Sequence, residues 1–449
     1  MLRVLSFIAK AGIRNQIEME KLILYLGKRG YLAIIRNMFT AIFSSAKLPE
    51  PDEQIIANMI AQAPGGRFMP GFFKDALGDL FITDEAIYVL NPIDSNMLQV
   101  SVIGWGEYEE ALQKFCKNIE EGIRTKFDGR RVRGMNFAWK PVSSHHLGYG
   151  RYLYPLEDFF EEEYRHEAEK LRVSEPTYSP EDVKAANLLV NTEIRQFMVR
   201  LAQVGKMMSK DATKLAKKQD VLQQLLSLDL ITEEYLLTCK QNQHTICIVP
   251  SKEHLTKEPM NSLRCSVCGR PFPEENLQVI YTLTEKGKRL IDGSLWMSIW
   301  ITELLKENGV REKSIKWKLE AHGEDIDIMV QDFDSTIFFE LKDREFGLGD
   351  AYPFIYRITR YGGTLGVVVT MDKVSTDAKK FFEEENRSRR PRIRIRYLEG
   401  PENIQKGISE IVKDLALLQV RRVIQHFSIR IGFDLWPIVE HWINTKESS

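Results

Sequence analysis

The sequence predicts a multidomain α/β protein, and composition, length and apolar patterning carry that prediction. The chain has 449 residues, of which 43% are hydrophobic and 28% charged, with ordinary numbers of Gly and Pro. Such a composition is typical of globular proteins and excludes collagenous, low-complexity and largely disordered classes. At about 100–200 residues per domain, the length implies about three domains. Helical periodicity and strand-like apolar runs both occur along the chain, which indicates an α/β class.

Charge and cysteine content narrow the function classes. The chain has 62 Lys+Arg against 63 Asp+Glu, a net charge of -1, which excludes a protein that binds phosphates with its whole surface. Any nucleic-acid contact must come from local patches. Five cysteines are too few for a disulfide scaffold. The apolar stretch at residues 31–43 is interrupted by Arg36 and Asn37 and is shorter than the roughly 20 residues of a bilayer span. We therefore expect a cytoplasmic protein without a membrane partner.

Residues 1–180 read as a mixed α/β region whose function the sequence does not indicate. Residues 17–26 and 108–119 have helical periodicity, whereas residues 99–103 alternate like a strand. The cluster Arg130, Arg131 and Arg133 could touch phosphate, but a solvated turn is favoured. The pair His145 and His146 lies in a predicted loop without a further acidic or His ligand near it in sequence, which disfavours a metal role.

Residues 183–238 carry three helical stripes and then a strand, after a Pro- and Ser-rich boundary at 174–180. This pattern resembles a winged helix-turn-helix. A helix that reads DNA usually offers Arg, Lys, Asn or Gln to the groove. The third stripe exposes Asp220, Gln223 and Gln224 without a basic residue, while the lysines lie on the second helix and the turn. Sequence-specific reading is therefore disfavoured, and phosphate contact or a structural, dimer-forming role stays open.

Four cysteines fall close together and predict a structural zinc ribbon over residues 239–283. Cys265 and Cys268, followed by Gly269, form a knuckle that aims two sulfurs at one metal ion. Cys239 supplies a third ligand, but its own half lacks a matching knuckle because position 242 is Asn. The fourth ligand is then expected from His244 or Cys247. Cys116, alone on a helix, is expected to be an ordinary core thiol.

A polar turn joins two predicted strands that carry the most informative charged residues. Residues 323–330 and 336–342 form a hairpin, with Asp327 near the end of its first strand. Glu340 and Lys342 are two residues apart and therefore project from one face of the second strand. Converging carboxylates can hold Mg²⁺ or Mn²⁺, and an ammonium beside them can position or activate a water and offset charge on a phosphate.

At these residues the sequence resembles the PD-(D/E)xK nuclease superfamily, the restriction-endonuclease-like fold. The match is Asp327, twelve intervening residues, then Glu340-Leu341-Lys342. It covers residues 284–400, where a helix precedes the hairpin and a helix, a buried strand, a helix and a strand follow it. The resemblance implies a mixed-sheet α/β/α core and metal-dependent hydrolysis of phosphodiesters. It also implies that Asp327 and Glu340 are metal ligands and that Lys342 is the catalytic lysine.

One feature of that family is missing, since many relatives have an acid in the first helix where this chain has Met297 and Ser298. Glu303 is the nearest alternative in that helix, although a helix-end surface acid is the more ordinary reading. Asp325 points to the same face as Asp327 and could replace or assist it.

Arginines near the hairpin form the local positive patches. Arg357, Arg360 and Tyr361 share one predicted helix face, where substrate contact and ordinary surface pairing are both open. Arg392, Arg394 and Arg396 alternate with isoleucines on a strand, which suits either phosphate contact or a solvated strand face. The helices at 401–449 are expected to pack on the nuclease domain or on a second subunit.

The sequence thus favours a Mg²⁺- or Mn²⁺-dependent nuclease with a winged-helix-like module and a zinc ribbon. A region of unknown role before a nuclease suggests a regulated effector, for example in a defence system. DNA is the favoured partner over RNA, and a homodimer or larger complex is a further expectation. The rival hypothesis is a non-enzymatic DNA-binding regulator that keeps the nuclease-like fold as a scaffold.

Overall fold

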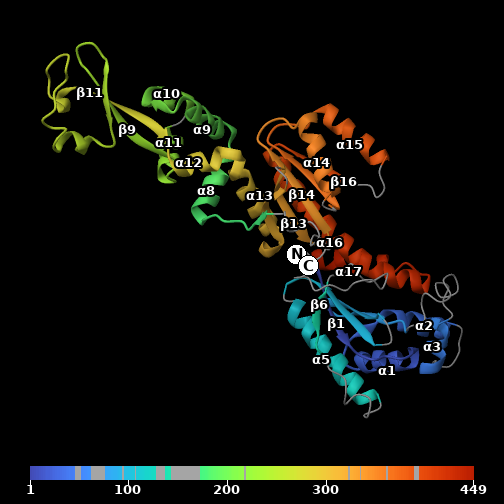
Figure 1. Ribbon diagram of the computed structural model, residues 1–449. Helices are drawn as coiled ribbons and strands as arrows, with labels where there is room; N and C mark the ends of the chain where they lie inside the picture. The colour runs from blue at the N-terminus through green and yellow to red at the C-terminus, as the bar shows by residue number, and fades with distance from the viewer. Residues whose placement is uncertain are drawn as a thin grey trace. The chain divides into compact units, whose positions relative to one another are not determined.

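The computed structural model confirms a multidomain mixed α/β protein with three sheets (Figure 1). Its contacts divide the chain into two compact units, each described below by itself. The first comprises Met1–Arg172, Gln331–Thr336 and Ile408–Ser449, and the second Val173–Val330 and Ile337–Gly407. The structure describes residues 1–45, 52–61, 76–93, 96–106, 108–127, 137–142, 172–216, 219–321, 324–333, 335–360, 363–388 and 394–448.

The first unit is built on a six-stranded sheet with the order β2-β3-β4-β5-β1-β6, whose neighbouring strands run antiparallel. Its strands are β1 (Arg3–Lys10), β2 (Leu32–Ala33), β3 (Asp79–Ile82), β4 (Ala86–Pro92), β5 (Met97–Gly104) and β6 (Lys140–Val142). Its helices are α1 (Gln16–Gly27), α2 (Ile34–Ser45), α3 (Glu53–Ala61), α5 (Tyr108–Lys126), most of α16 (Pro401–Ile431) and α17 (Trp436–Glu447).

The core of this unit lies between the sheet and helices α1 and α5. The helical stripes expected from the sequence fall within these two helices, and both stripes are buried except at their half-buried first residues, Ile17 and Tyr108. Phe115 of α5 packs its ring 4.6 Å from Tyr88 and 4.8 Å from Tyr31, measured between centroids. Such aromatic pairs add to the burial of apolar surface that stabilises the packing of the helices on the sheet.

The C-terminal helices pack differently from the prediction. Residues Ile408–Ser449 belong to the same unit as the N-terminal sheet, and the ring of Trp442 in α17 packs against that of Trp105 with centroids 5.4 Å apart. The Trp442 indole also donates to the backbone oxygen of Thr83 at 3.3 Å. Helix α17 therefore packs on the N-terminal sheet, a partner that the expectation for residues 401–449, the nuclease domain or a second subunit, did not include. An apolar stripe shows that a helix must be covered, but it does not identify the covering element.

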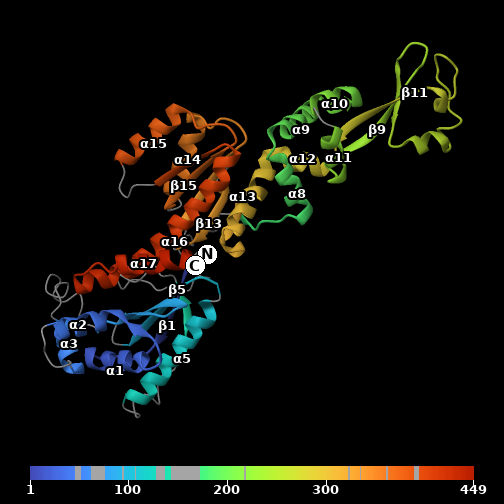
Figure 2. The same ribbon diagram turned by 180° about the vertical axis from the view of Figure 1, so that it is seen from behind.

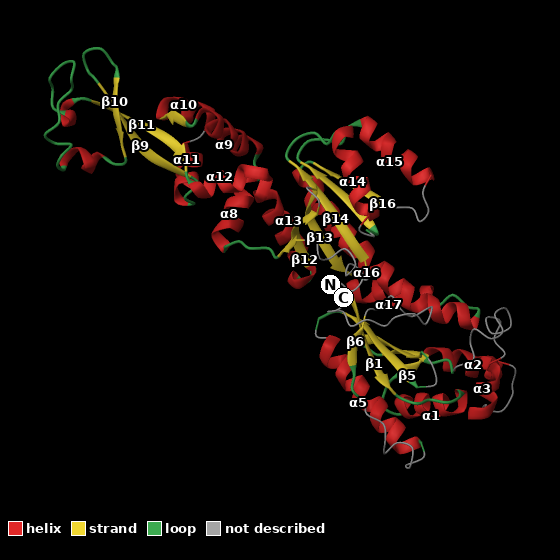
Figure 3. Cartoon of the chain, in the orientation of Figure 1, coloured by secondary structure: helices red, strands yellow, loops and turns green. Residues whose placement is uncertain are grey.

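In the second unit, a helical module and a four-stranded sheet follow the boundary at 174–180. The helices are α8 (Pro180–Leu189), α9 (Thr192–Val204), α10 (Ser209–Ala216), α11 (Gln219–Ser227) and α12 (Glu285–Ile291). The sheet has the order β10-β9-β11-β8, formed by β8 (Lys206–Met208), β9 (Ile231–Thr238), β10 (Thr245–Val249) and β11 (Asn276–Leu283). Because β9 pairs with β11, the cysteine-rich segment is an insertion between two neighbouring strands of one sheet (Figure 3).

A second, mixed sheet in this unit has the order β16-β15-β14-β13-β12-β7. β12 and β13 are antiparallel, whereas β14, β15 and β16 are parallel. The strands are β7 (Arg172–Ser174), β12 (Ile315–Ala321), β13 (Glu324–Asp332), β14 (Ser335–Lys342), β15 (Leu365–Thr370) and β16 (Arg394–Glu399). The helices around it are α13 (Leu295–Glu307), α14 (Leu348–Arg360) and α15 (Thr376–Ser388).

Helices cover this mixed sheet on two sides, with α13 on one side and α14 and α15 on the other (Figures 1 and 2). Trp317 of β12 donates to Thr302 of α13 at 2.8 Å, which fixes that helix against the sheet. On the other side, α14 packs so closely on Gly366 that a larger residue there would force the Ile358 side chain to shift. Among the described residues, no helix combines the length and apolar character needed to cross a membrane.

Candidate active site and metal centre

Asp327, Glu340 and Lys342 lie on the two strands of the predicted hairpin. Asp327 is in β13 and half-buried, while Glu340 and Lys342 come near the end of β14, Glu340 with only 4% of its surface exposed. The Asp327 carboxylate accepts a hydrogen bond from the backbone N–H of Leu341 at 2.7 Å. That bond joins the two strands at the residue between Glu340 and Lys342, so the hairpin brings all three side chains into one neighbourhood.

Two cations hold the Glu340 carboxylate. Its Oε1 lies 2.9 Å from the Lys342 ammonium, and its Oε2 lies 3.0 Å from Nη2 of Arg357. Burial by itself lowers the pKa of Lys342, but the charges of Glu340 and Asp327 outweigh it and raise the pKa above its ordinary value. The lysine is therefore an ammonium at neutral pH. Together with Asp327 and Arg357, these groups give two negative and two positive charges.

Arg357 and Arg360, predicted to share one helix face, point in different directions from α14. Arg357 is 5% exposed and paired with Glu340, so it reaches the site but is not a surface side chain. Arg360 is exposed and donates to the hydroxyl of Tyr356 at 3.0 Å. Positions three residues apart on a helix differ by about 60° in direction, which is enough to place one inside and one outside. Tyr361 lies outside the described residues.

The alternative acid in the first helix does not join the site. Glu303 of α13 accepts from the hydroxyl of Tyr178 at 2.6 Å and from Lys306 at 2.8 Å. These partners hold the pKa of Glu303 below its ordinary value despite partial burial, which by itself would raise it. Its carboxylate is therefore part of a structural contact. Of Asp325, the structure describes only the backbone, which pairs with Glu320.

The arginines of β16 face away from the candidate site. In β15, Val368 lies beside Glu340 and Val367 lies beside Arg396. Neighbouring residues of a strand point to opposite faces, and residues in register on parallel strands share a face. Arg394 and Arg396, both exposed, therefore point to the face opposite Glu340 and Lys342. They do not extend the site along its own face, and Arg392 lies outside the described residues.

The carboxylate pair fits a hard divalent cation. Asp327 and Glu340 offer oxygen donors on adjacent strands, and Mg²⁺ in proteins often uses one or two carboxylates with water and substrate phosphate. Glu340 is engaged on both oxygens, so a cation of charge +2 would compete with Arg357 or Lys342 for it. An ion bound here would draw its remaining ligands from solvent and substrate.

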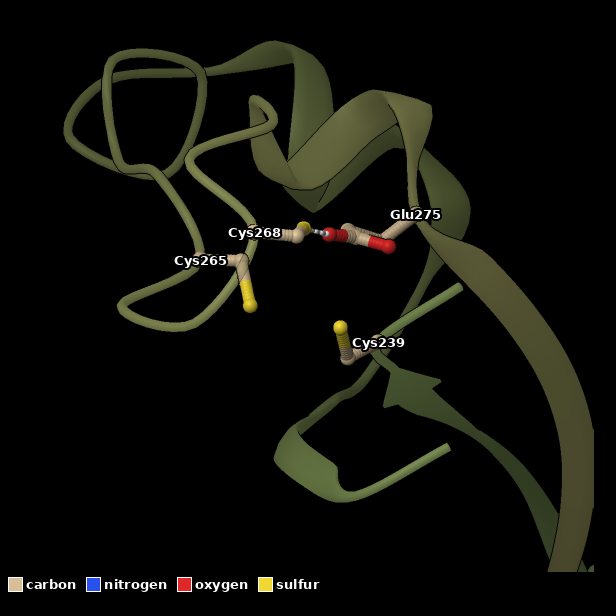
Figure 4. Close-up of side chains that lie close together, drawn as sticks. All are labelled: Cys239, Cys265, Cys268 and Glu275. Atoms are coloured by element: carbon tan, nitrogen blue, oxygen red, sulfur yellow. Dashed lines mark hydrogen bonds between the residues drawn. The ribbon is translucent and has the colours of Figure 1, made fainter. Parts of the chain in front are cut away.

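A second potential metal centre lies in the insertion between β9 and β11. The sulfurs of Cys239, Cys265 and Cys268 converge with the carboxylate of Glu275 (Figure 4). One ligand atom from each residue lies within 4.8 Å of the other three. Cys239, Cys265 and Cys268 come from the predicted positions. The knuckle is closed by Gly269, which has a φ of +72° and whose N–H donates to the Cys265 oxygen at 2.9 Å.

The fourth member of this group corrects the prediction. His244 and Cys247 are described residues but do not belong to it; the His244 ring contacts Asn242 at 2.6 Å, and Cys247 lies in β10. Glu275 takes the place instead, because β11 begins at the next residue and pairs back onto β9 beside Cys239. Its Oε2 accepts from the backbone N–H of Lys240 at 2.6 Å, which orients the carboxylate.

The chemistry of these donors suits a metal ion such as zinc. Three thiols and one carboxylate provide four ligands, the number a closed tetrahedral site needs. The Cys268 thiol donates to Glu275 at 2.6 Å, and that carboxylate raises the pKa of Cys268 to about 12. The same contact, with the backbone N–H of Lys240, lowers the pKa of Glu275. A cation in this position would replace the proton that the two groups share.

Cys116 and two polar groups of the N-terminal region were also singled out from the sequence. Cys116 is buried in the core of the first unit, as expected, and burial raises the pKa of its thiol well above the ordinary value. The groups Arg130, Arg131 and Arg133 and His145 and His146 lie outside the described residues.

Comparison with known proteins gives little further information. No protein-family model matches the chain, and no curated protein matches it. The crystal structure of protein VC1899 from Vibrio cholerae is similar at a TM-score of 0.33 and 10% identity, covering 55% of this chain and 60% of that chain. A repair endonuclease from Pyrococcus abyssi is similar at 0.18 and 16% identity, covering 41% and 96%.

Proposed function

We propose that this chain is a metal-dependent nuclease of the PD-(D/E)xK type that hydrolyses nucleic-acid phosphodiesters. The observation that carries the proposal is the hairpin contact, in which Asp327 accepts from Leu341 N–H while Glu340 and Lys342 flank that residue. A mixed sheet with three parallel strands and helices on two sides supports the same fold. DNA is the preferred substrate in this proposal, with RNA as the alternative.

Each residue of the site has a distinct role in this proposal. Asp327 and Glu340 would hold Mg²⁺ or Mn²⁺, which when bound supplies Lewis-acid stabilisation and favours ionisation of water. Lys342 stays protonated beside Glu340 and can orient a water or offset charge developing on the scissile phosphate. Arg357 keeps the Glu340 carboxylate turned toward α14.

The module before the nuclease-like domain supports a nucleic-acid or assembly role. Helices α9, α10 and α11 and strands β8, β9 and β11 follow one another in the order expected of a winged helix. The cysteine-rich insertion lies in the position of the wing. The sequence of α11 contains no Lys or Arg, and Asp220, Gln223 and Gln224 are exposed on it. We propose that this module positions the chain on phosphates or on a second copy rather than reading bases.

The cysteine group is proposed to be a structural zinc site. Its four protein ligands would leave no open coordination position for a substrate, which is characteristic of structural rather than catalytic zinc. Bound zinc would tie the end of β9 to the beginning of β11.

Cleavage by the full-length chain tests the nuclease proposal. Wild-type protein is incubated with single- and double-stranded DNA and RNA in Mg²⁺, in Mn²⁺ and with EDTA. We expect cutting only with metal, and a loss of about 100-fold or more in Asp327→Asn and Glu340→Gln. Glu399→Gln is the matched control, because Glu399 is also paired with a lysine, Lys379, at 2.9 Å in the same sheet. Equal cutting by wild type and Glu340→Gln would refute the site.

A non-enzymatic DNA-binding regulator is the second candidate. It is favoured by α13, where Met297 and Ser298 are buried and Glu303 is occupied by Tyr178 and Lys306. The first helix thus supplies no acid to the site. Salt-sensitive binding without cutting on any of the four substrates would favour this candidate.

A further inference from the structure

The tip of the hairpin that carries the candidate site belongs to the other compact unit. Residues Gln331–Thr336, where β13 turns into β14, group with the N-terminal sheet, whereas the strands on either side group with the mixed sheet. Asp327 lies five residues before Asp332 on β13, and Glu340 lies seven residues after Phe333 along the chain. The candidate metal ligands are therefore close in sequence to a turn that the N-terminal unit holds.

One side chain of the N-terminal sheet contacts two residues of this tip, Asp332 and Phe333. Nη1 of Arg3, in β1, lies 3.0 Å from Oδ1 and 3.1 Å from Oδ2 of Asp332. The two side chains are only 10% and 2% exposed. The Arg3 guanidinium also lies over the ring of Phe333, 4.8 Å from its centroid. A charge pair and a cation–π contact thus converge on two successive residues.

The tip has a backbone conformation that needs such support. Phe333 has a φ of +55°, a region that bulky L-residues rarely adopt, and its side chain is 2% exposed. Asp332 accepts the N–H of Phe333 at 2.9 Å through the same oxygen that Arg3 contacts. Arg3 therefore stabilises a turn that the two residues alone would not favour.

We propose that Arg3 is a positioning residue for the candidate metal site, acting through the hairpin tip. The inference rests on the proposed function, because it assigns Asp327 and Glu340 to a metal. Both strands leave the tip as a paired ladder, so a change in the turn alters where the two carboxylates lie. Outer partners that orient metal ligands commonly affect metal affinity by about 10–100-fold when removed.

Direct metal binding tests this proposal without requiring a cleavage substrate. Zinc-loaded full-length protein is titrated with Mn²⁺, and unbound Mn²⁺ is measured by electron paramagnetic resonance. Binding that disappears in Asp327→Asn defines the candidate site. We expect Arg3→Met and Asp332→Asn to weaken that binding about tenfold, and Arg3→Lys to weaken it less. Thermal unfolding of each variant shows whether it is folded.

The chain supplies a matched control in Arg29. This arginine pairs with Glu121 at 2.9 Å and lies over the Tyr25 ring at 4.6 Å, so it has the same two kinds of partner in the same unit. It is in the segment after α1 and is exposed, far in sequence from the hairpin. Arg29→Met should leave Mn²⁺ affinity unchanged.

The outcomes separate the two proposals. Weaker Mn²⁺ binding in folded Arg3→Met or Asp332→Asn, with Arg29→Met unchanged, supports the positioning role. Unchanged affinity in both folded variants, or an equal loss in Arg29→Met, overturns it while leaving the nuclease proposal intact. If wild-type protein binds no Mn²⁺ that depends on Asp327, the proposed function itself fails, and the positioning role fails with it.

Discussion

At the scale of single residues, the Glu340 carboxylate is the most constrained group of the site, with Lys342 on one oxygen and Arg357 on the other. Removing one partner of a buried ion pair costs about 3–5 kcal/mol, because the other charge stays buried. Arg357→Met should therefore lower the free energy of unfolding by that order.

Added metal should partly restore this loss, since a cation at Glu340 replaces the missing positive charge. We expect Mn²⁺ to raise the thermal midpoint of Arg357→Met more than that of wild type, measured by differential scanning fluorimetry with zinc held constant. An equal or smaller shift in the variant would show that the metal does not bind beside Glu340.

A second residue-scale prediction concerns Asp79, which caps the start of α2. Its carboxylate accepts from the N–H groups of Ile35 at 2.8 Å and Arg36 at 2.9 Å, and burial raises its pKa to about 7. Between about pH 4 and 7, the folded chain keeps a proton that the unfolded chain has lost. The raised pKa of Asp79 therefore adds to the free energy of unfolding below about pH 4, and this addition disappears as the pH rises to about 7.

Comparison with Asp79→Asn isolates this contribution, because asparagine does not ionise. The free energy of unfolding of wild type should fall relative to the variant by up to about 4 kcal/mol from pH 4 to pH 7, at about 1.4 kcal/mol per pKa unit. Urea titrations at several pH values measure it. A difference that stays constant with pH would mean that Asp79 is charged in the folded protein throughout this range.

The sequence predicted which residues belong to the two sites better than it predicted which side chains contact one another. Cys239, Cys265 and Cys268 could be predicted because thiols are rare and the knuckle has a fixed spacing. Glu275 could not, since glutamate is common and only the pairing of β9 with β11 brings it beside Cys239. Arg357 was recognised as a candidate, but its burial against Glu340 depends on how α14 is rotated over the sheet.

At the scale of elements, the cysteine insertion should depend on its metal. Glu275→Ala removes one of the four proposed ligands, so zinc release to a chromogenic chelator should become easier by more than about 100-fold. Cys247→Ser is the control and should behave as wild type, because Cys247 lies in β10 outside the ligand group. The reverse result would restore Cys247 as a ligand and remove Glu275.

Strong periodicity predicted the long elements well. The hairpin strands lie within a few residues of their expected positions, and α14, β15, α15 and β16 follow them in the expected order of helix, strand, helix and strand. The strand β8, only three residues long, and β12, whose sequence mixes lysines with apolar residues, carried too weak a signal for prediction. Both are strands because neighbouring strands supply their hydrogen-bond partners, which is a tertiary effect.

At the scale of the whole molecule, chain order and compact units do not coincide. The first unit takes in the hairpin tip and the C-terminal helices together with the N-terminal sheet. Dividing the sequence into consecutive domains could not predict these units, because the buried contact between Arg3 and Asp332 joins residues 329 positions apart. Within the first unit, Arg3 of the N-terminal sheet thereby contacts Asp332 and Phe333 of the hairpin tip.

The central claim is that Asp327, Glu340 and Lys342 form a hydrolytic site and not merely a salt-bridged hairpin. Metal-dependent cleavage by Lys342→Met and Lys379→Met tests it most directly. Each of these lysines, Lys342 in β14 and Lys379 in α15, pairs at 2.9 Å with a glutamate of the same mixed sheet. We predict that Lys342→Met loses about 100-fold or more of the rate, while Lys379→Met cuts like wild type. Equal rates in the two folded variants would contradict the account.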